Sequence, residues 1–141
     1  ERQYYSDYTL YTGGAGLGYT FSDGLGLYGG IDLARRKYPY AASRSKEYTA
    51  RIGGYKMFKN GVYFNAAALY RLSRYDEGSY HTDGERRRDR QTIFTAALGA
   101  SKWQFKNISP ELRFKRTVSR SNSDFYVYRQ NEIALNLRYR F

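Results

Sequence analysis

Two groups of residues in this 141-residue chain have types and spacings that could do chemistry. The run Gly13-Gly14-Ala15-Gly16-Leu17-Gly18 suggests a phosphate-binding loop, but no Lys-Ser/Thr pair follows it and the next residues alternate instead of opening a helix. Ser79, His81 and Asp83 share one polar segment, but their spacing supplies no base that a third group holds in place. We therefore expect neither nucleotide binding nor an enzyme.

Basic residues form the third group that could bind a partner. The chain has 24 Lys and Arg against 13 Asp and Glu, a net charge of +11, with clusters at Arg35-Arg36-Lys37 and at Arg86-Arg87-Arg88 followed by Arg90. No stacking aromatics are interleaved with these clusters, so we do not expect nucleic acid as a partner. With no Cys and a single His, His81, we also expect no metal site and no cofactor.

The elements that position these residues are seven runs of alternating hydropathy, each of which predicts a β-strand. Tight turns at 22–24, 59–61 and 104–107 alternate with longer, more charged loops at 39–46, 76–90 and 120–124. The fifth run leaves its register open, because Phe94 and Leu98 compete with Ile93 and Ala97 for the apolar face. The runs span about Tyr8–Phe21, Leu25–Tyr38, Glu47–Phe58, Val62–Tyr75, Gln91–Trp103, Ile108–Ser119 and a last run that ends at Phe141.

The composition and the loop pattern favour an all-β transmembrane antiparallel barrel of the bacterial outer membrane. No stretch is long and apolar enough for a spanning helix, while aromatics make up 18% of the chain and gather near the ends of the runs. Short periplasmic turns, long extracellular loops and aromatic girdles are typical of such barrels. The alternative is a soluble β-sandwich rich in Tyr, which strands of about 12 residues disfavour.

The odd number of runs predicts a larger barrel. Single-chain bacterial barrels have an even number of strands and both termini in the periplasm. If Phe141 ends in the periplasm, Glu1 lies in an extracellular loop, and we expect residues 1–141 to be the C-terminal part of a cut or longer barrel whose remaining strands are N-terminal. A missed weak strand between Glu1 and Tyr8 is the competing explanation.

In a barrel, one face of each strand lines the lumen and the loops reach the outer leaflet. We expect a charged lumen formed by Asp32, Arg36, Arg51, Arg71, Glu111, Arg113, Lys115, Glu132 and Arg138. Arginine forks bind phosphates bidentately, so the basic clusters favour contacts with lipopolysaccharide phosphates, with solvated loops as the alternative. The candidate lipopolysaccharide contacts are Arg35, Lys37, Arg86, Arg87 and Arg88.

The last third of the chain carries a family resemblance. Ile108-Ser-Pro-Glu-Leu-Arg-Phe-Lys, Ser119-Arg-Ser-Asn-Ser-Asp-Phe-Tyr-Val-Tyr-Arg-Gln-Asn-Glu and the closing Leu137-Arg-Tyr-Arg-Phe resemble the C-terminal barrel of the surface lipoprotein assembly modifier family. The resemblance implies a barrel of about fourteen strands, of which seven would lie here, behind a periplasmic helical-repeat domain. It also implies delivery of lipoproteins to the cell surface, with host association in some relatives. A porin-like or adhesin-like barrel for solute passage or host contact is the alternative.

The C-terminal strand also resembles the signal by which the barrel assembly machinery recognises its clients. Leu135, Leu137, Tyr139 and Phe141 alternate along one face and end on an aromatic residue. Asn136 stands where Gly is common and Ala134 where a polar residue is common. The expected partners are therefore outer-membrane lipids and lipopolysaccharide, the barrel assembly machinery, the N-terminal remainder of the barrel and a surface lipoprotein client.

Overall fold

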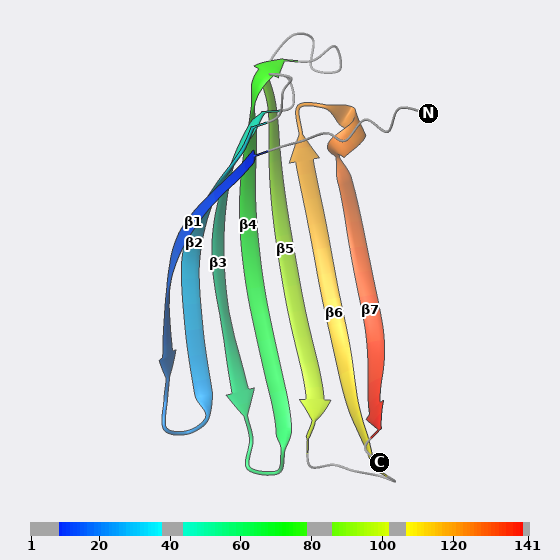
Figure 1. Ribbon diagram of the computed structural model, residues 1–141. Helices are drawn as coiled ribbons and strands as arrows, with labels where there is room; N and C mark the ends of the chain where they lie inside the picture. The colour runs from blue at the N-terminus through cyan, green and yellow to red at the C-terminus, as the bar shows by residue number, and fades with distance from the viewer. Residues whose placement is uncertain (1–8, 38–43, 79–85, 102–106, 140–141) are drawn as a thin grey trace, which may run out of the picture.

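A computed structural model describes residues 9–37, 44–78, 86–101 and 107–139, and these form seven β-strands and one short 3-10 helix (Figure 1). Ser79, His81, Asp83 and Phe141 lie outside the described residues. The strands are β1 (Thr9–Thr20), β2 (Leu25–Lys37), β3 (Ser45–Met57), β4 (Val62–Gly78), β5 (Arg86–Ala100), β6 (Ile108–Ser121) and β7 (Tyr128–Tyr139), and the helix η3 (Asp124–Tyr126) precedes β7.

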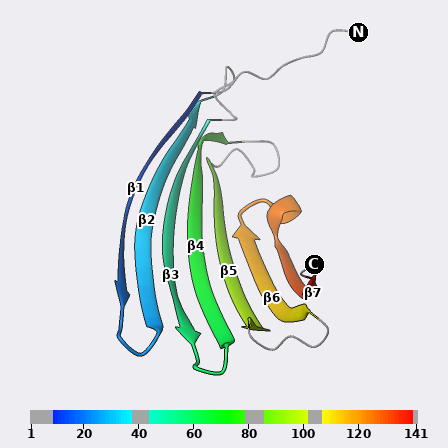
Figure 2. The same ribbon diagram turned by 60° about the horizontal axis from the view of Figure 1, so that its bottom comes forward.

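The seven strands form one open antiparallel sheet in sequence order, from β1 at one edge to β7 at the other. The sheet is curved, and within the described residues neither edge strand has a second partner (Figure 2). The expectation of an all-β chain of seven antiparallel strands is thereby confirmed. The sheet order also shows that the chain runs up and down without a crossover, so neighbours in sequence are neighbours in space.

The tight turns at one end of the sheet use a repeated chemistry. Gly24 and Gly61 have φ angles of 81° and 85°, which only glycine adopts at little cost. The residue before each glycine accepts a backbone N–H bond with its side chain, Asp23 from Leu25 at 3.3 Å and Asn60 from Val62 at 3.1 Å. Tight turns at 22–24 and 59–61 were predicted from the sequence, and the geometry of these two turns confirms them.

Each turn is also bonded to the next hairpin. The Gly24 carbonyl accepts the N–H of Met57 at 3.1 Å, and the Gly61 carbonyl accepts the N–H of Ser101 at 2.8 Å. In addition, the Lys56 ammonium donates to the Asp23 carboxylate at 3.0 Å, and this bond lowers the pKa of Asp23 below its ordinary 3.8. The short-turn end is therefore tied together across three hairpins.

The opposite end of the sheet carries the longer connections, and there the predicted boundaries were wrong. Residues 76–78 and 86–90, predicted as loop, belong to β4 and β5, and β6 continues to Ser121. β4 changes register between Arg74 and Gly78, so the ladder continues past an irregularity. Polar residues can extend a strand here because the hydrogen bonds between strands are made by the backbone. Only the burial of one side of a strand requires alternating apolar residues.

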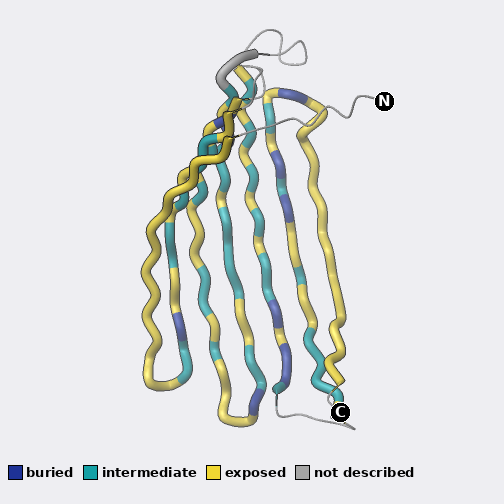
Figure 3. The backbone as a smooth tube through the Cα atoms, in the orientation of Figure 1, coloured by how far each residue is buried: buried dark blue, intermediate teal, exposed yellow. Residues whose placement is uncertain are grey.

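The two faces of the sheet differ in exposure. Along β5 the side chains alternate between exposed and partly buried, and directly paired residues carry the alternation across the sheet (Figure 3). Side chains crowd on the inside of a curve, so we take the less exposed face as concave and the other as convex. Ala97 and Ala100 are the buried apolar residues of the described part, so no ordinary soluble core is present there. None of the described residues forms a helix with the length and apolar character needed to cross a membrane.

Three tyrosine rings lie over glycines on the neighbouring strand. Tyr55 is paired with Gly26, Tyr28 with Gly53 and Tyr63 with Gly99. A Cβ built at any of these glycines would overlap the opposing ring. The rings therefore fill space that only glycine leaves open, and all three lie on the concave face.

Candidate functional site

The register brings all nine charged residues predicted for the lumen onto one face. Directly paired residues of an antiparallel ladder point to the same side, and one such row runs Asp32–Thr49–Arg71–Gln91–Ser119 across β2 to β6. Alternation along each strand adds the others to this face. The concave face thus carries Asp32, Arg36, Arg51, Arg71, Glu111, Arg113, Lys115, Glu132 and Arg138.

The acidic residues of the concave face are paired with its cations. Asp32 lies 3.5 Å from Arg51, and Glu132 lies 3.9 Å from Lys115. Glu47, whose side chain is 15% exposed, lies between Arg36 at 3.4 Å and Arg71 at 3.7 Å. Positive and negative charges therefore nearly balance on the concave face, which is not lined by charges of a single sign.

One chain of contacts crosses most of the sheet from the Glu47 site. The Arg71 guanidinium also donates to the Gln91 side-chain oxygen at 3.2 Å, and the Gln91 amide donates to the Tyr128 hydroxyl at 2.9 Å. Together with the Arg36–Glu47 pair, these contacts link β2, β3, β4, β5 and β7 through side chains. Side chains as well as backbone thus hold the curvature of the wall.

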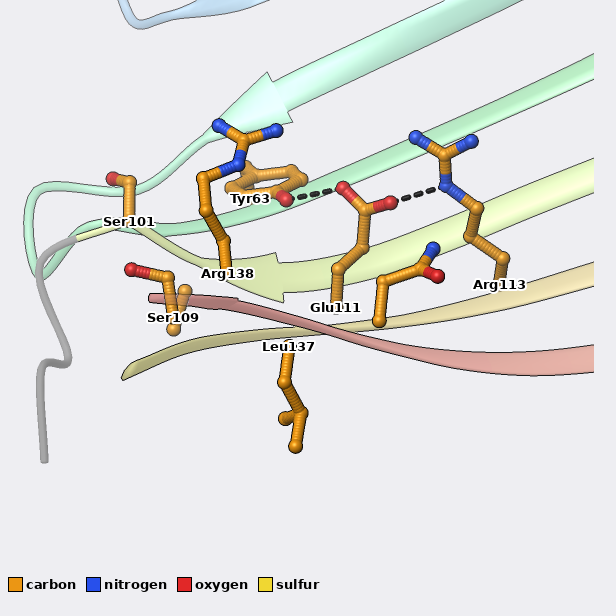
Figure 4. A pocket seen from close by; sticks show the side chains of 9 residues that line it. Tyr63, Ser101, Ser109, Glu111, Arg113, Leu137 and Arg138 are labelled. Carbon is orange, nitrogen blue, oxygen red and sulfur yellow. Dashed lines mark hydrogen bonds and ion pairs between the residues drawn. The ribbon is translucent and has the colours of Figure 1, made fainter. Parts of the chain in front are cut away.

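A polar pocket of about 310 Å³ opens on the concave face near the short-turn end (Figure 4). The Glu111 carboxylate accepts hydrogen bonds from the Tyr63 hydroxyl and from the Arg113 guanidinium, while Arg138 and Asn136 also line the pocket. The Glu111 carboxylate is thus engaged with two donors, whereas the buried Ser109 hydroxyl, which also lines the pocket, has no hydrogen-bond partner among the described residues. Among the described residues, no group of His, Asp and Glu side chains could hold a metal ion.

At the other end of the sheet, Arg87 forms a compact cluster. Its guanidinium donates to Asp89 at 3.1 and 2.5 Å, and its central carbon lies 3.2 Å from the ring centre of Tyr126 and 4.4 Å from that of Tyr75. The Ser121 hydroxyl donates to Asp89 at 2.5 Å. The cluster joins η3 to β4, β5 and β6, and it engages Arg87 fully.

On β1 to β4 the convex face is apolar through most of its height, whereas on β5 to β7 it also carries Arg90, Arg116, Arg120 and Arg129. Leu17 is 88% exposed, Ile52 is 68% exposed and Ile133 is 74% exposed, which no water-soluble sheet would tolerate at this density. Leu135, Leu137 and Tyr139 lie on this face, as the sequence predicted for one side of the last strand. A convex apolar face opposite a concave ionic face is the arrangement expected of a sheet surrounded by lipid.

The five candidate lipopolysaccharide contacts divide between the two faces. Arg35, Lys37, Arg86 and Arg88 share the convex parity at the end with long connections, whereas Arg87 points to the concave side. Sequence reasoning missed Lys46 and Arg74, which lie in the same convex row. Their alternation with Tyr48 and Leu72 was the available signal, but both residues stood at the margins of predicted loops.

The comparison with protein families gives one result. The family model described as surface lipoprotein assembly modifier matches residues 2–141, which is nearly the whole chain. No curated protein and no solved structure matches it significantly. The open antiparallel sheet, with its lipid-type convex face and ionic concave face, agrees with part of such a barrel. The chain therefore belongs to the surface lipoprotein assembly modifier family, outer-membrane β-barrel proteins that act in the display of lipoproteins on the bacterial surface.

Proposed function

We propose that this chain supplies the C-terminal half of a barrel of about fourteen strands, and that its concave face forms an inner wall that contacts the lipoprotein client during delivery. The observation that supports this proposal most is the division of charge: these ion pairs lie on the concave face and most of the large aliphatic side chains on the convex face. The proposed role is one of guidance, without bond making or breaking by this chain.

The open edges support completion by further strands. β1 and β7 each pair on one side within the described residues. In a bilayer core, every unpaired backbone N–H and C=O costs several kcal/mol, so an open sheet edge does not persist there. We assign the missing partners to the N-terminal remainder of the same barrel.

The concave face suits contact with an extended polypeptide. Its carboxylates and guanidiniums are compensated in pairs, so the face repels neither sign of charge strongly. Arg113, Lys115 and Arg138 keep exposed donors toward the interior, and a passing backbone offers carbonyl acceptors in any sequence. The wall can thus contact different clients without matching one side-chain pattern.

Other partners belong to the same proposal. Leu135, Leu137 and Tyr139, with Phe141, form the signal read by the barrel assembly machinery. Arg35, Lys37, Arg86 and Arg88 lie on the lipid-facing side, where lipopolysaccharide is the anionic neighbour.

Site-specific photo-crosslinking in cells tests the inner-wall role. A photoreactive residue replaces Thr49 or Thr95 on the concave face, and the matched controls replace the adjacent Ala50 or Ala96 on the convex face. We expect adducts with the lipoprotein client from the concave positions and adducts with lipid from the convex ones. Client adducts from the convex positions would contradict the proposal, and a steady open conductance without client adducts would favour a porin-like barrel.

A further inference from the structure

The convex face carries an uninterrupted row of cations at one end. Arg35 pairs with Lys46, Lys46 with Arg74, and Arg74 with Arg88, so the row crosses β2, β3, β4 and β5 at directly paired positions. Directly opposed side chains have their Cβ atoms about 4.5–5.5 Å apart, and like charges at that spacing destabilise a sheet. The row therefore calls for a counter-charge.

For Lys46, Arg74 and Arg88, no counter-charge is supplied by the part of the chain that the structure describes. The strand carboxylates with a described side chain, Asp32, Glu47, Asp89, Glu111 and Glu132, all lie on the concave face. Lys46, Arg74 and Arg88 are exposed, and among the described residues their side chains make no ion pair. An external anion bound at the row would offset the repulsion.

The row borders a groove of about 410 Å³. Lys46, Tyr48, Arg74, Arg86 and Arg88 line it from the convex side, and Tyr75 and Arg87 complete the lining. Five of these seven residues are cations. Asp89 forms an ion pair with Arg87 but not with Lys46, Arg74, Arg86 or Arg88. The groove thus combines several guanidinium forks with two tyrosine rings, a set that matches a phosphorylated sugar.

The level of the groove in the membrane identifies the source of the phosphate. Two residues below Arg74 and Lys46 on the same face stand Leu72 and Tyr48, where the apolar surface of β3 and β4 begins. Two residues of strand rise by about 6.6 Å, so the cations lie just above the hydrocarbon boundary, at headgroup level. The long connections lie at this end, which makes it the extracellular end of an outer-membrane barrel.

We propose that this groove binds a phosphate of the lipid A headgroup of lipopolysaccharide, with Lys46, Arg74 and Arg88 as its principal ligands and Arg86 beside them. The inference rests on the orientation in the proposed function, because only the outer leaflet presents this lipid. The lipid next to the barrel then has a defined binding site on β3, β4 and β5, in place of a diffuse attraction to a basic surface.

Lipid binding by the purified full-length protein in detergent tests the proposal. The probes are bisphosphorylated lipid A, the same lipid after removal of both phosphates, and inorganic phosphate. The variant Lys46→Gln/Arg74→Gln/Arg88→Gln should bind bisphosphorylated lipid A about tenfold or more weakly than wild type, since three charge-assisted contacts are lost. The charge-keeping variant Lys46→Arg/Arg74→Lys/Arg88→Lys should retain most of the affinity.

A same-face control separates a built site from general charge. Arg116→Gln/Arg120→Gln/Arg129→Gln removes three convex-face cations from β6 and β7, outside the groove, and should weaken binding much less. Equal losses in the two glutamine variants, unchanged binding in the groove variant, or equal binding of the dephosphorylated lipid would overturn the proposal. Inorganic phosphate binding as tightly as lipid A would overturn the assignment to lipid.

Folding and the proposed function are checked separately. Heat-modifiable migration in gels reports whether each variant forms its barrel, and the single variant Arg88→Gln together with the dephosphorylated lipid decides the outcome if the triple variant does not fold. If the groove variant binds lipid A as wild type does while Thr49 and Thr95 still give client adducts, this inference alone is rejected. Loss of those adducts with lipid binding intact would reject the proposed function alone.

Discussion

Adjacent alanines in the middle of β4 provide a matched test of which face meets lipid. Ala68 pairs with Ile52 and Phe94 on the convex face, whereas Ala67 pairs with Gly53 and Thr95 on the concave face. The same substitution, Ala→Arg, can therefore be made at two neighbouring positions of one strand. Only the direction of the side chain differs.

The magnitude follows from the height of the apolar band on β4. The convex positions from Val62 to Leu72 are apolar, and Arg74 follows. These ten residue steps, at about 3.3 Å each, span about 33 Å, which a strand tilt of about 40° reduces to about 25 Å of membrane thickness. Ala68 lies about one residue from the centre of that band, so Ala68→Arg places a guanidinium near the midplane.

Arginine at the midplane of a barrel costs about 2–4 kcal/mol. Ala68→Arg should therefore lower the equilibrium constant for folding by about 30-fold to 900-fold. Ala67→Arg extends toward the polar interior and should cost much less. Urea unfolding of the full-length protein in lipid vesicles, followed by tryptophan fluorescence, measures both values.

Equal destabilisation by the two variants, or a larger loss for Ala67→Arg, would refute the assignment of the faces. The barrel fraction in heat-modifiability gels at zero denaturant serves as the control, because both variants must start folded for the comparison to hold.

The remaining predictions concern packing, pairing, pH and orientation. Gly53→Val should cost about 1–3 kcal/mol because its side chain overlaps the Tyr28 ring, and Tyr28→Ala in the same chain should recover part of that loss in unfolding measurements. Arg87→Gln should cost about 1–3 kcal/mol, since Asp89 is only 15% exposed and loses its cation, and should speed tryptic cleavage between β6 and β7; unchanged cleavage would count against the cluster. The bond to Lys56 lowers the pKa of Asp23, so this bond stabilises the fold fully at pH values above the ordinary pKa of 3.8. The stabilisation is lost as the pH falls through the lowered pKa. The stability difference between wild type and Asp23→Asn should therefore disappear only in strong acid. On intact cells, an impermeant thiol reagent should label Asp124→Cys but not Asn60→Cys, and the reverse pattern would invert the orientation.

Alternation made most of the sheet predictable from the sequence. In β2, β4 and β7 one parity is mostly apolar and the other is mostly polar or small, and a shift of one residue would turn most of the apolar side chains inward. The side on which Arg51, Arg71 and Arg138 lie could therefore be inferred without coordinates. β5 could not be resolved in this way, because Ile93 and Ala97 are as apolar as Phe94 and Leu98. The structure places Ile93 opposite Leu69, a small apolar patch inside the concave face.

Contacts that depend on register could not be predicted. The Tyr28–Gly53 pair joins residues 25 positions apart, and shifting β3 by one residue would abolish it. The cation row had the same difficulty, because Lys46, Arg74 and Arg88 become neighbours only when three strands are aligned. The sequence showed basic clusters along the chain, whereas the structure shows that Arg87 belongs to another face than Arg86 and Arg88.

The bonds from Gly24 and Gly61 to the following hairpins have a consequence for how such a sheet changes size. The hairpins β1–β2 and β3–β4 each present a glycine carbonyl at the turn, and the hairpin that follows each of them donates an N–H to that carbonyl, from Met57 and from Ser101. One side of such a hairpin offers an acceptor and the other a donor, so a whole hairpin can be inserted or lost while the turn hydrogen bonds to its neighbours are still formed. Adding strands two at a time keeps the apolar side chains on the outer face, so duplication of a hairpin widens the sheet without requiring changes in the neighbouring strands.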